Sequence, residues 1–188
     1  MPFPVLGEPL PIELVNTLYA ERGRLADGLT TPDDLVAWLQ AHEHQLQTDV
    51  IHVAGQRVNE FRELRDAVRA LFQATLAHEW PPAPAVDTLN RISAAAPAFP
   101  QLRWSSAGKP HVTVKYRGDD PAVSALTEVA QSALQLLGGP DRLRLRACHA
   151  PGCVLFFLKD HPRREWCSGV CGNRARAARH YQRHRQTK

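Results

Sequence analysis

Two pairs of cysteines are the residues of this chain best suited to chemistry. Cys148 and Cys153 have four residues between them, and Cys167 and Cys171 have three. Zinc prefers thiolate ligands, and structural sites hold it with four ligands at tetrahedral geometry. A Pro-Gly turn inside the first pair can direct both sulfurs to one point, and the second spacing places both cysteines on one face of a helix. We therefore predict that these four cysteines bind one structural Zn²⁺.

Free thiols and disulfides are the alternatives for the cysteines. The N-terminus has neither the basic nor the apolar region of a signal peptide, so we expect a cytoplasmic protein, and a reducing compartment favours metal binding over disulfides. Four thiolates leave no open position for an activated water, so we expect the zinc to be structural. Residues 1–140 show no Ser/His/Asp order of a triad, no Gly-rich phosphate loop and no His-rich metal spacing, so we expect no enzyme. Three histidines that could in principle replace a cysteine are expected at the surface instead: His149, His161 and His180.

Charge divides the chain into an acidic part and a basic part. Residues 1–140 hold 11 Lys+Arg and 16 Asp+Glu, whereas residues 141–188 hold 12 and 3. This division indicates that only the second part contacts a polyanion.

The basic segment after Cys171 is expected to be helical. At about 100° per residue its arginines form a stripe on the side away from the cysteines, and such a stripe suits phosphates in a DNA major groove. Arg174 does not belong to this stripe. It falls on the side of the cysteines, where it either neutralises the thiolates or contacts nucleic acid. A solvated face without a partner is the alternative for the stripe. The predicted nucleic-acid-binding residues are Arg174, Arg176, Arg179 and Arg183.

The remaining pattern is mainly helical. Apolar periodicity and capping signals predict helices over 12–21, from Thr31 to near residue 47, and over 57–78, 85–95 and 121–137. Alternation around a turn at 105–110 predicts a β-hairpin, and a second hairpin is expected within 154–166, turning at 160–162. Gly138-Gly139-Pro140 marks a boundary. We predict a mainly α domain with a β-hairpin (α+β) over 1–140, and a treble-clef-like zinc-binding module ending in a basic helix over 141–188.

Few residues of the first domain point to a ligand. Asn16 lies in an otherwise apolar segment, where we expect it to bridge two helices. Trp38, Phe61 and Trp104 could line a sensor pocket, although an ordinary core explains them equally well.

Two stretches resemble known families. Cys148-x4-Cys153, Trp166-Cys167-Ser168 and Cys171-Gly172-Asn173-Arg174 together resemble the bacterial CGNR zinc-finger family. Leu14-Val15-Asn16-Thr17-Leu18 is similar to the VNTL signature of its N-terminal ABATE domain, so the resemblance covers essentially the whole chain. Many members of the family have one more residue between the last two cysteines than the three found here. The signature is often preceded by Asp-Phe, whereas this chain has Glu13-Leu14 at that position.

The resemblance implies a stress-induced bacterial transcriptional regulator with a mostly helical N-terminal domain and a DNA-binding zinc finger. Its zinc ligands correspond to Cys148, Cys153, Cys167 and Cys171. The leading expectation is therefore zinc-dependent DNA binding; a protein-interaction module in which the zinc shapes a docking surface is the alternative, with RNA binding third. No apolar run of about 18 residues is present, so we expect no membrane partner. A homodimer and a small-molecule effector at the N-terminal domain are compatible with this role.

Overall fold

The structure is a computed structural model that describes residues 2–50, 53, 55–104, 108–117 and 120–186, with the side chains of 184–186 left out. Five helices build its body. They are α1 (Leu10–Val15), α2 (Pro32–Ala41), α3 (Val58–Ala77), α4 (Ala83–Ser93) and α5 (Pro121–Gly138). Single 3₁₀ turns occur at Glu43–Gln45, Gly55–Arg57 and Pro140–Arg144.

Local capping explains where the predicted helices begin. Thr31 and Asp34 form a capping box at the start of α2, in which each side chain accepts a hydrogen bond from the other residue's backbone N–H. At the start of α5, the Asp120 carboxylate accepts hydrogen bonds from two backbone N–H groups of the first turn. The predictions for α2, α3, α4 and α5 are confirmed, except that α2 already ends at Ala41.

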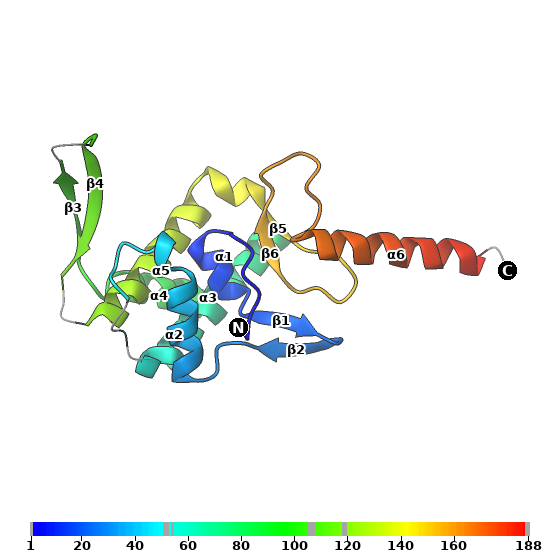
Figure 1. The fold of residues 1–188 in the computed structure, drawn as a ribbon, viewed down its shortest axis with the longest axis horizontal. Coiled ribbons are helices and arrows are strands. Elements are labelled where there is room, and N and C mark those ends of the chain that lie inside the picture. Colours follow the sequence, from blue (N-terminus) through cyan, green and yellow to red (C-terminus); the bar gives the residue numbers. More distant parts are fainter. Residues whose placement is uncertain (1, 51–52, 54, 105–107, 118–119, 187–188) are drawn as a thin grey trace.

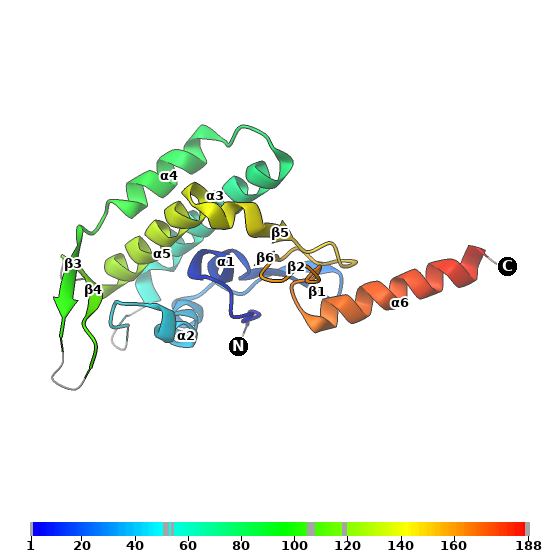
Figure 2. The same cartoon turned by 90° about the horizontal axis from the view of Figure 1, so that it is seen from above.

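The short helix α1 lies in the middle of the body. All six of its residues are buried, and it contacts α3 and α5 as well as a strand from the far end of the chain (Figures 1 and 2). The core around it combines the apolar stripe of α3 with residues from both ends of the sequence, including Phe3 and Phe156. The N- and C-terminal parts therefore share one hydrophobic core.

Three separate antiparallel hairpins complete the part of the fold that the structure describes. They pair β1 (Leu18–Glu21) with β2 (Arg24–Asp27), β3 (Ala98–Arg103) with β4 (His111–Tyr116), and β5 (Leu145–Ala147) with β6 (Phe156–Leu158). The chain ends in α6 (Gly169–Gln186), which projects from one end of the molecule, whereas the β3–β4 ribbon projects from the opposite end (Figure 1). The predicted β3–β4 hairpin is confirmed, although residues 105–107 of its turn lie outside the described residues.

Two predictions about the elements are wrong. The helix expected over 12–21 ends at Val15, because Thr17 turns back to donate to the Leu14 carbonyl and the chain continues as β1. The hairpin expected within 154–166 does not form either. Strand β6 pairs with β5 across the first cysteine pair, because this pairing carries Phe156 and Leu158 into the core.

The aromatic residues considered for a sensor pocket are not gathered in one place. Trp38 and Phe61 are fully buried neighbours with ring centroids 6.1 Å apart, whereas Trp104 is 73% exposed beyond the end of β3. The first two are core residues, and the three do not line a common pocket. Within the described ranges, no helix combines the length and the apolar character needed to cross a membrane.

Candidate metal centre and the basic helix

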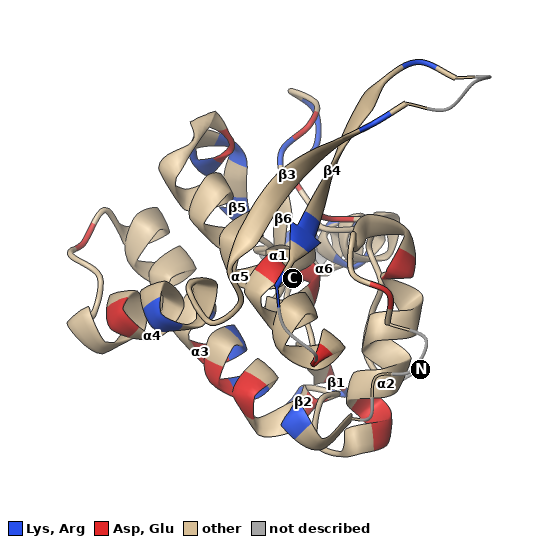
Figure 3. Ribbon diagram, turned by 90° about the vertical axis from the view of Figure 1, so that its left-hand side faces the viewer, with Lys and Arg blue, Asp and Glu red and all other residues tan. Residues whose placement is uncertain are grey.

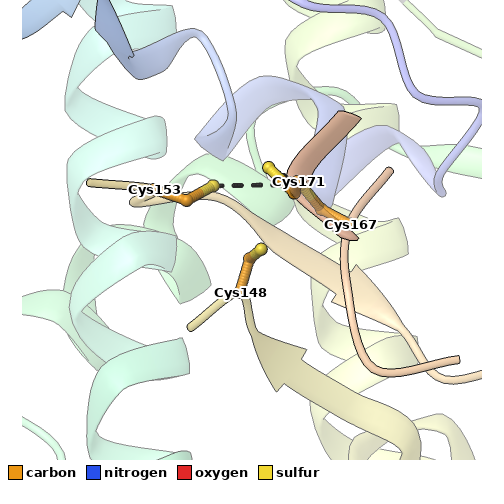
Figure 4. Close-up of side chains that lie close together, drawn as sticks. All are labelled: Cys148, Cys153, Cys167 and Cys171. Atoms are coloured by element: carbon orange, nitrogen blue, oxygen red, sulfur yellow. Dashed lines mark hydrogen bonds between the residues drawn. The ribbon is translucent and has the colours of Figure 1, made fainter. Parts of the chain in front are cut away.

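The four cysteines come from two places that the fold brings together. Cys148 follows β5 and Cys153 precedes β6, while Cys167 precedes α6 and Cys171 lies in its first turn. Their four Sγ atoms all lie within 4.8 Å of one another (Figure 4). Three of the cysteines are buried and Cys153 is half-buried. In the described part of the chain this is the one cluster of metal-ligating side chains found.

The sulfur geometry fits a tetrahedral ion. Four sulfurs that each lie about 2.3 Å from one zinc ion are separated from one another by about 3.8 Å. The Sγ atom of Cys167 lies 3.8 Å from that of Cys153 and 3.5 Å from that of Cys171. Cys148, Cys153, Cys167 and Cys171 are thus positioned to bind one structural Zn²⁺, as predicted.

Backbone hydrogen bonds fix both ligand pairs. The first pair lies in a tight turn in which the Cys153 N–H donates to the Ala150 carbonyl and the Cys148 N–H donates to the Leu155 carbonyl. Gly152 adopts a φ of 72° there, a left-handed conformation that glycine adopts at little cost. In the second pair, the Cys171 N–H donates to Ser168 Oγ, so Ser168 caps the start of α6. A turn followed by the first turn of a helix is the treble-clef-like arrangement that was predicted.

Four thiols this close together cannot all ionise without a cation. Hydrogen bonds from the Cys153 and Cys167 thiols lower the pKa of Cys148. The hydrogen bond between Cys153 and Cys148 raises the pKa of Cys153 to about 11. Zinc binding displaces the protons that remain, since only thiolates are ligands, so metal binding and folding of the module are coupled.

The residues after Cys171 support the site directly. The Arg174 Nη2 atom donates to Cys171 Sγ at 3.0 Å, and this hydrogen bond raises the pKa of Arg174. A Cβ atom at Gly172 would lie 3.1 Å from the indole of Trp166. The indole therefore packs directly against Gly172, in the space that a larger side chain would occupy. Asn173 Oδ1 accepts a hydrogen bond from Arg176. Of the four predicted nucleic-acid contacts, Arg174 is therefore directed at the cysteine cluster.

The other three arginines lie along the exposed part of α6. Arg176, Arg179 and Arg183 are exposed and follow one another at steps of three and four residues, on the side of the helix away from Arg174. α6 contains no acidic residue. Contact of these arginines with nucleic acid stays a prediction.

Comparison with protein families agrees with this geometry. The ABATE family model, described as a putative stress-induced transcription regulator, matches residues 8–140. The chain belongs to the ABATE family. A CGNR zinc-finger model matches residues 144–184, which contain the four cysteines. No curated protein matches the chain.

An ion pair joins the ABATE domain to the CGNR finger. The Glu8 carboxylate, 4% exposed, accepts hydrogen bonds from the Arg164 guanidinium and from the Leu158 N–H. Arg164 also donates to the carbonyls of Leu158 and Cys167 and lies over the Phe157 ring. The donors of Arg164 are therefore used within the protein.

No pattern in the sequence indicates this contact. Glu8 stands in a proline-rich stretch without periodicity, and its partner lies 156 residues away in the chain. Glu13, the counterpart of the family's acid before VNTL, holds the segment in place by accepting hydrogen bonds from the N–H groups of Leu6 and Glu8, at 2.9 and 2.6 Å. The division at residue 140 into two domains stays a prediction, since these contacts and the core cross it.

Proposed function

We propose that this chain is a zinc-dependent DNA-binding protein that regulates transcription under stress, and that it is not an enzyme. One observation carries the proposal. The zinc centre fixes only the first turn of α6, and the rest of the helix projects away from the body (Figure 2). The body is acidic, and Arg176, Arg179 and Arg183 are exposed on the projecting helix.

The dimensions and charge of α6 support this role. Its 18 residues extend about 27 Å at 1.5 Å per residue, and an α-helix fits the DNA major groove. Without acidic side chains, α6 presents arginine at successive turns to a phosphate backbone. The acidic charge of residues 1–140 disfavours close approach of DNA to the body and favours binding through α6. The family description agrees with a regulator.

A protein-docking module is the second candidate. Val170 and Tyr181 are 73% and 71% exposed and lie on one side of α6, eleven residues apart. In that function the zinc fixes a helix that a protein partner covers.

Salt-dependent binding to mixed genomic duplex DNA tests the proposal. The zinc-loaded protein is compared with the same protein after chelation, with an α6 double variant (Arg179→Gln and Arg183→Gln), and with a charge-matched control double variant (Arg91→Gln and Arg142→Gln). The control arginines are exposed and lie outside α6. We expect affinity to fall steeply with salt and to disappear on chelation.

The two double variants give the decisive comparison. Each phosphate contact contributes about 0.9 to the slope of log K against log salt, so the α6 variant should lower the slope by about 1.8 and the control should leave it unchanged. Equal slopes in the two variants contradict the role of α6. No binding at low salt, with zinc bound and α6 folded, favours the protein-docking module.

A further inference from the structure

The β3–β4 ribbon is a second basic element within the acidic part of the chain. Residues 98–117 hold four of the 11 Lys+Arg of residues 1–140 and none of the 16 Asp+Glu. Figure 3 shows Lys and Arg but no acidic residue on the ribbon, while acidic residues mark α2, α3 and α4. The four cations are Arg103, Lys109, Lys115 and Arg117.

The ribbon projects away from the body, and its described side chains make few contacts with it. The Val114 N–H donates to Gln47 at 3.4 Å, and the Tyr116 hydroxyl donates to Gln131 at 3.3 Å. The four cations are all exposed, and the ion pairs found among the described residues include none of them. Their charge is therefore available to a partner.

The strand register gives the ribbon two different faces. Arg103 pairs with His111 and Phe99 with Lys115, so these cations share one face. Leu102 pairs with Val112 on the other face, where both side chains are more than 60% exposed. Trp104 continues this apolar face toward the turn. An isolated two-stranded ribbon is marginally stable, so such an exposed ribbon is suited to ordering by a bound partner.

We propose that the β3–β4 ribbon is a second DNA-contacting element, so that one molecule contacts two separate duplex segments. Two-stranded ribbons enter DNA grooves in several protein classes, with cations on phosphates and apolar side chains against base edges or between base steps. The choice of duplex DNA as the polyanion rests on the proposed function of α6. A second copy of the ribbon is a poor partner, because the cations of the two copies would repel each other.

The placement of the two basic elements leads to two duplex segments rather than one. The ribbon and α6 extend from opposite ends of the molecule, with the body between them (Figures 1 and 2). Residues 1–97 carry most of the acidic charge of the chain and would repel a duplex bent along the body. Binding at both ends therefore brings two stretches of DNA together.

A bridging assay with the full-length, zinc-loaded protein tests this inference. One duplex is immobilised on beads and a second, fluorescent duplex is offered with increasing protein. The proteins compared are the wild type, a ribbon double variant (Arg103→Gln and Lys115→Gln), the α6 double variant and the charge-matched control double variant. The salt slope for a single duplex is measured in parallel, and the circular dichroism of each variant checks its fold.

We expect the wild type and the control variant to retain the fluorescent duplex on the beads. The ribbon variant should still bind the immobilised duplex through α6, but retention of the second duplex should fall to background. Bridging by the ribbon variant at the wild-type level overturns the inference, since a dimer with two α6 helices would then explain the bridging. Absence of bridging by the wild type overturns it as well.

Two further outcomes separate this inference from the proposed function. If the wild type binds a duplex through α6 and the ribbon variant equals it in both assays, the ribbon inference fails and the proposed function stands. If the wild type binds no DNA at low salt, the proposed function fails and the inference with it. Loss of binding to anionic lipid vesicles in the ribbon variant, with unchanged DNA bridging, would assign the ribbon to a lipid surface and overturn the inference.

Discussion

Asn16 and Phe156, 140 residues apart in the chain, exchange two buried hydrogen bonds. The Asn16 Nδ2 atom donates to the Phe156 carbonyl at 3.0 Å, and the Phe156 N–H donates to Asn16 Oδ1 at 2.9 Å. The Asn16 side chain thus makes the two backbone hydrogen bonds at Phe156 that a neighbouring strand would make with β6. The expectation that Asn16 bridges two helices is wrong, because it joins the end of α1 to a strand of the CGNR finger.

Replacement of Asn16 by Leu should destabilise the protein and loosen the finger. The variant leaves a buried N–H and a buried carbonyl of Phe156 without partners, at a cost of about 2–4 kcal/mol. Urea denaturation measures the free energy of unfolding, and hydrogen exchange at the Phe156 amide reports the local effect. Asn59→Ala on the exposed face of α3 is the control. Unchanged stability of Asn16→Leu would show that water or a rearranged backbone satisfies Phe156.

The sequence predicts what depends on local chemistry. The spacing of four cysteines indicates the zinc site, and Thr31 and Asp34 mark the start of α2, because ligand convergence and capping involve residues only a few positions apart. The Asn16–Phe156 and Glu8–Arg164 contacts depend on the tertiary fold, and no periodicity points to them. The same limit explains the wrong hairpin: the apolar run over 154–158 predicts a strand but cannot select β5 as its partner.

The β3–β4 ribbon shows a different limit. Alternation correctly predicts a hairpin, and an alternating strand normally turns its apolar face to a core. Leu102 and Val112 are instead exposed, because the ribbon extends beyond the helices that would cover it. Pattern alone does not distinguish an apolar face buried in the same chain from one left for a partner.

Removal of zinc should melt only part of the finger. Leu145, Phe156 and Leu158 belong to the main core, whereas Cys148, Leu155, Phe157 and the second cysteine pair form a separate cluster around the metal site. Without zinc, the thiols of the cluster stay largely protonated, and no metal bonds join Cys167 and Cys171 to the first cysteine pair. The start of α6 is then no longer held in place. We expect chelation to abolish amide protection in α6 and to preserve it at Phe156 and Leu158.

The alternative outcome is that all of residues 141–188 unfold when zinc is removed. Hydrogen exchange with mass spectrometry resolves the two, with the fully buried α1 as an internal reference for the intact body. Loss of protection at β6 together with α6 would mean that the shared core does not hold the finger. Protection of α6 without zinc would mean that its anchor is not the metal.

Gly172 and Gly169 offer a matched pair within α6. A Cβ atom at Gly169 meets nothing within 4 Å, whereas one at Gly172 lies 3.1 Å from Trp166. Alanine in place of an exposed helical glycine stabilises by up to about 1 kcal/mol, so Gly169→Ala should be neutral or stabilising. Gly172→Val should displace the Trp166 indole, weaken zinc binding and change tryptophan fluorescence. Equal zinc affinity in the two variants would contradict packing of the indole against Gly172.

Arg174 and Arg176 separate support of the metal from contact with DNA. Arg174 donates to Cys171 Sγ at 3.0 Å, whereas the guanidinium of Arg176 contacts Asn173 on the exposed side of α6. Residues that hydrogen-bond to metal ligands typically change metal affinity by about 10- to 100-fold when replaced. Arg174→Gln should therefore lower the affinity for zinc, measured by competition with a chromophoric chelator, by about tenfold or more.

The matched variant Arg176→Gln should keep the zinc affinity of the wild type and lower the salt slope of DNA binding by about 0.9. Arg174→Gln, measured with saturating zinc, should leave that slope unchanged because its guanidinium lies against the thiolate cluster. The opposite assignment, in which Arg174 alters the slope and leaves zinc affinity intact, would place Arg174 on the nucleic acid. It would also mean that the hydrogen bond to Cys171 breaks when DNA binds.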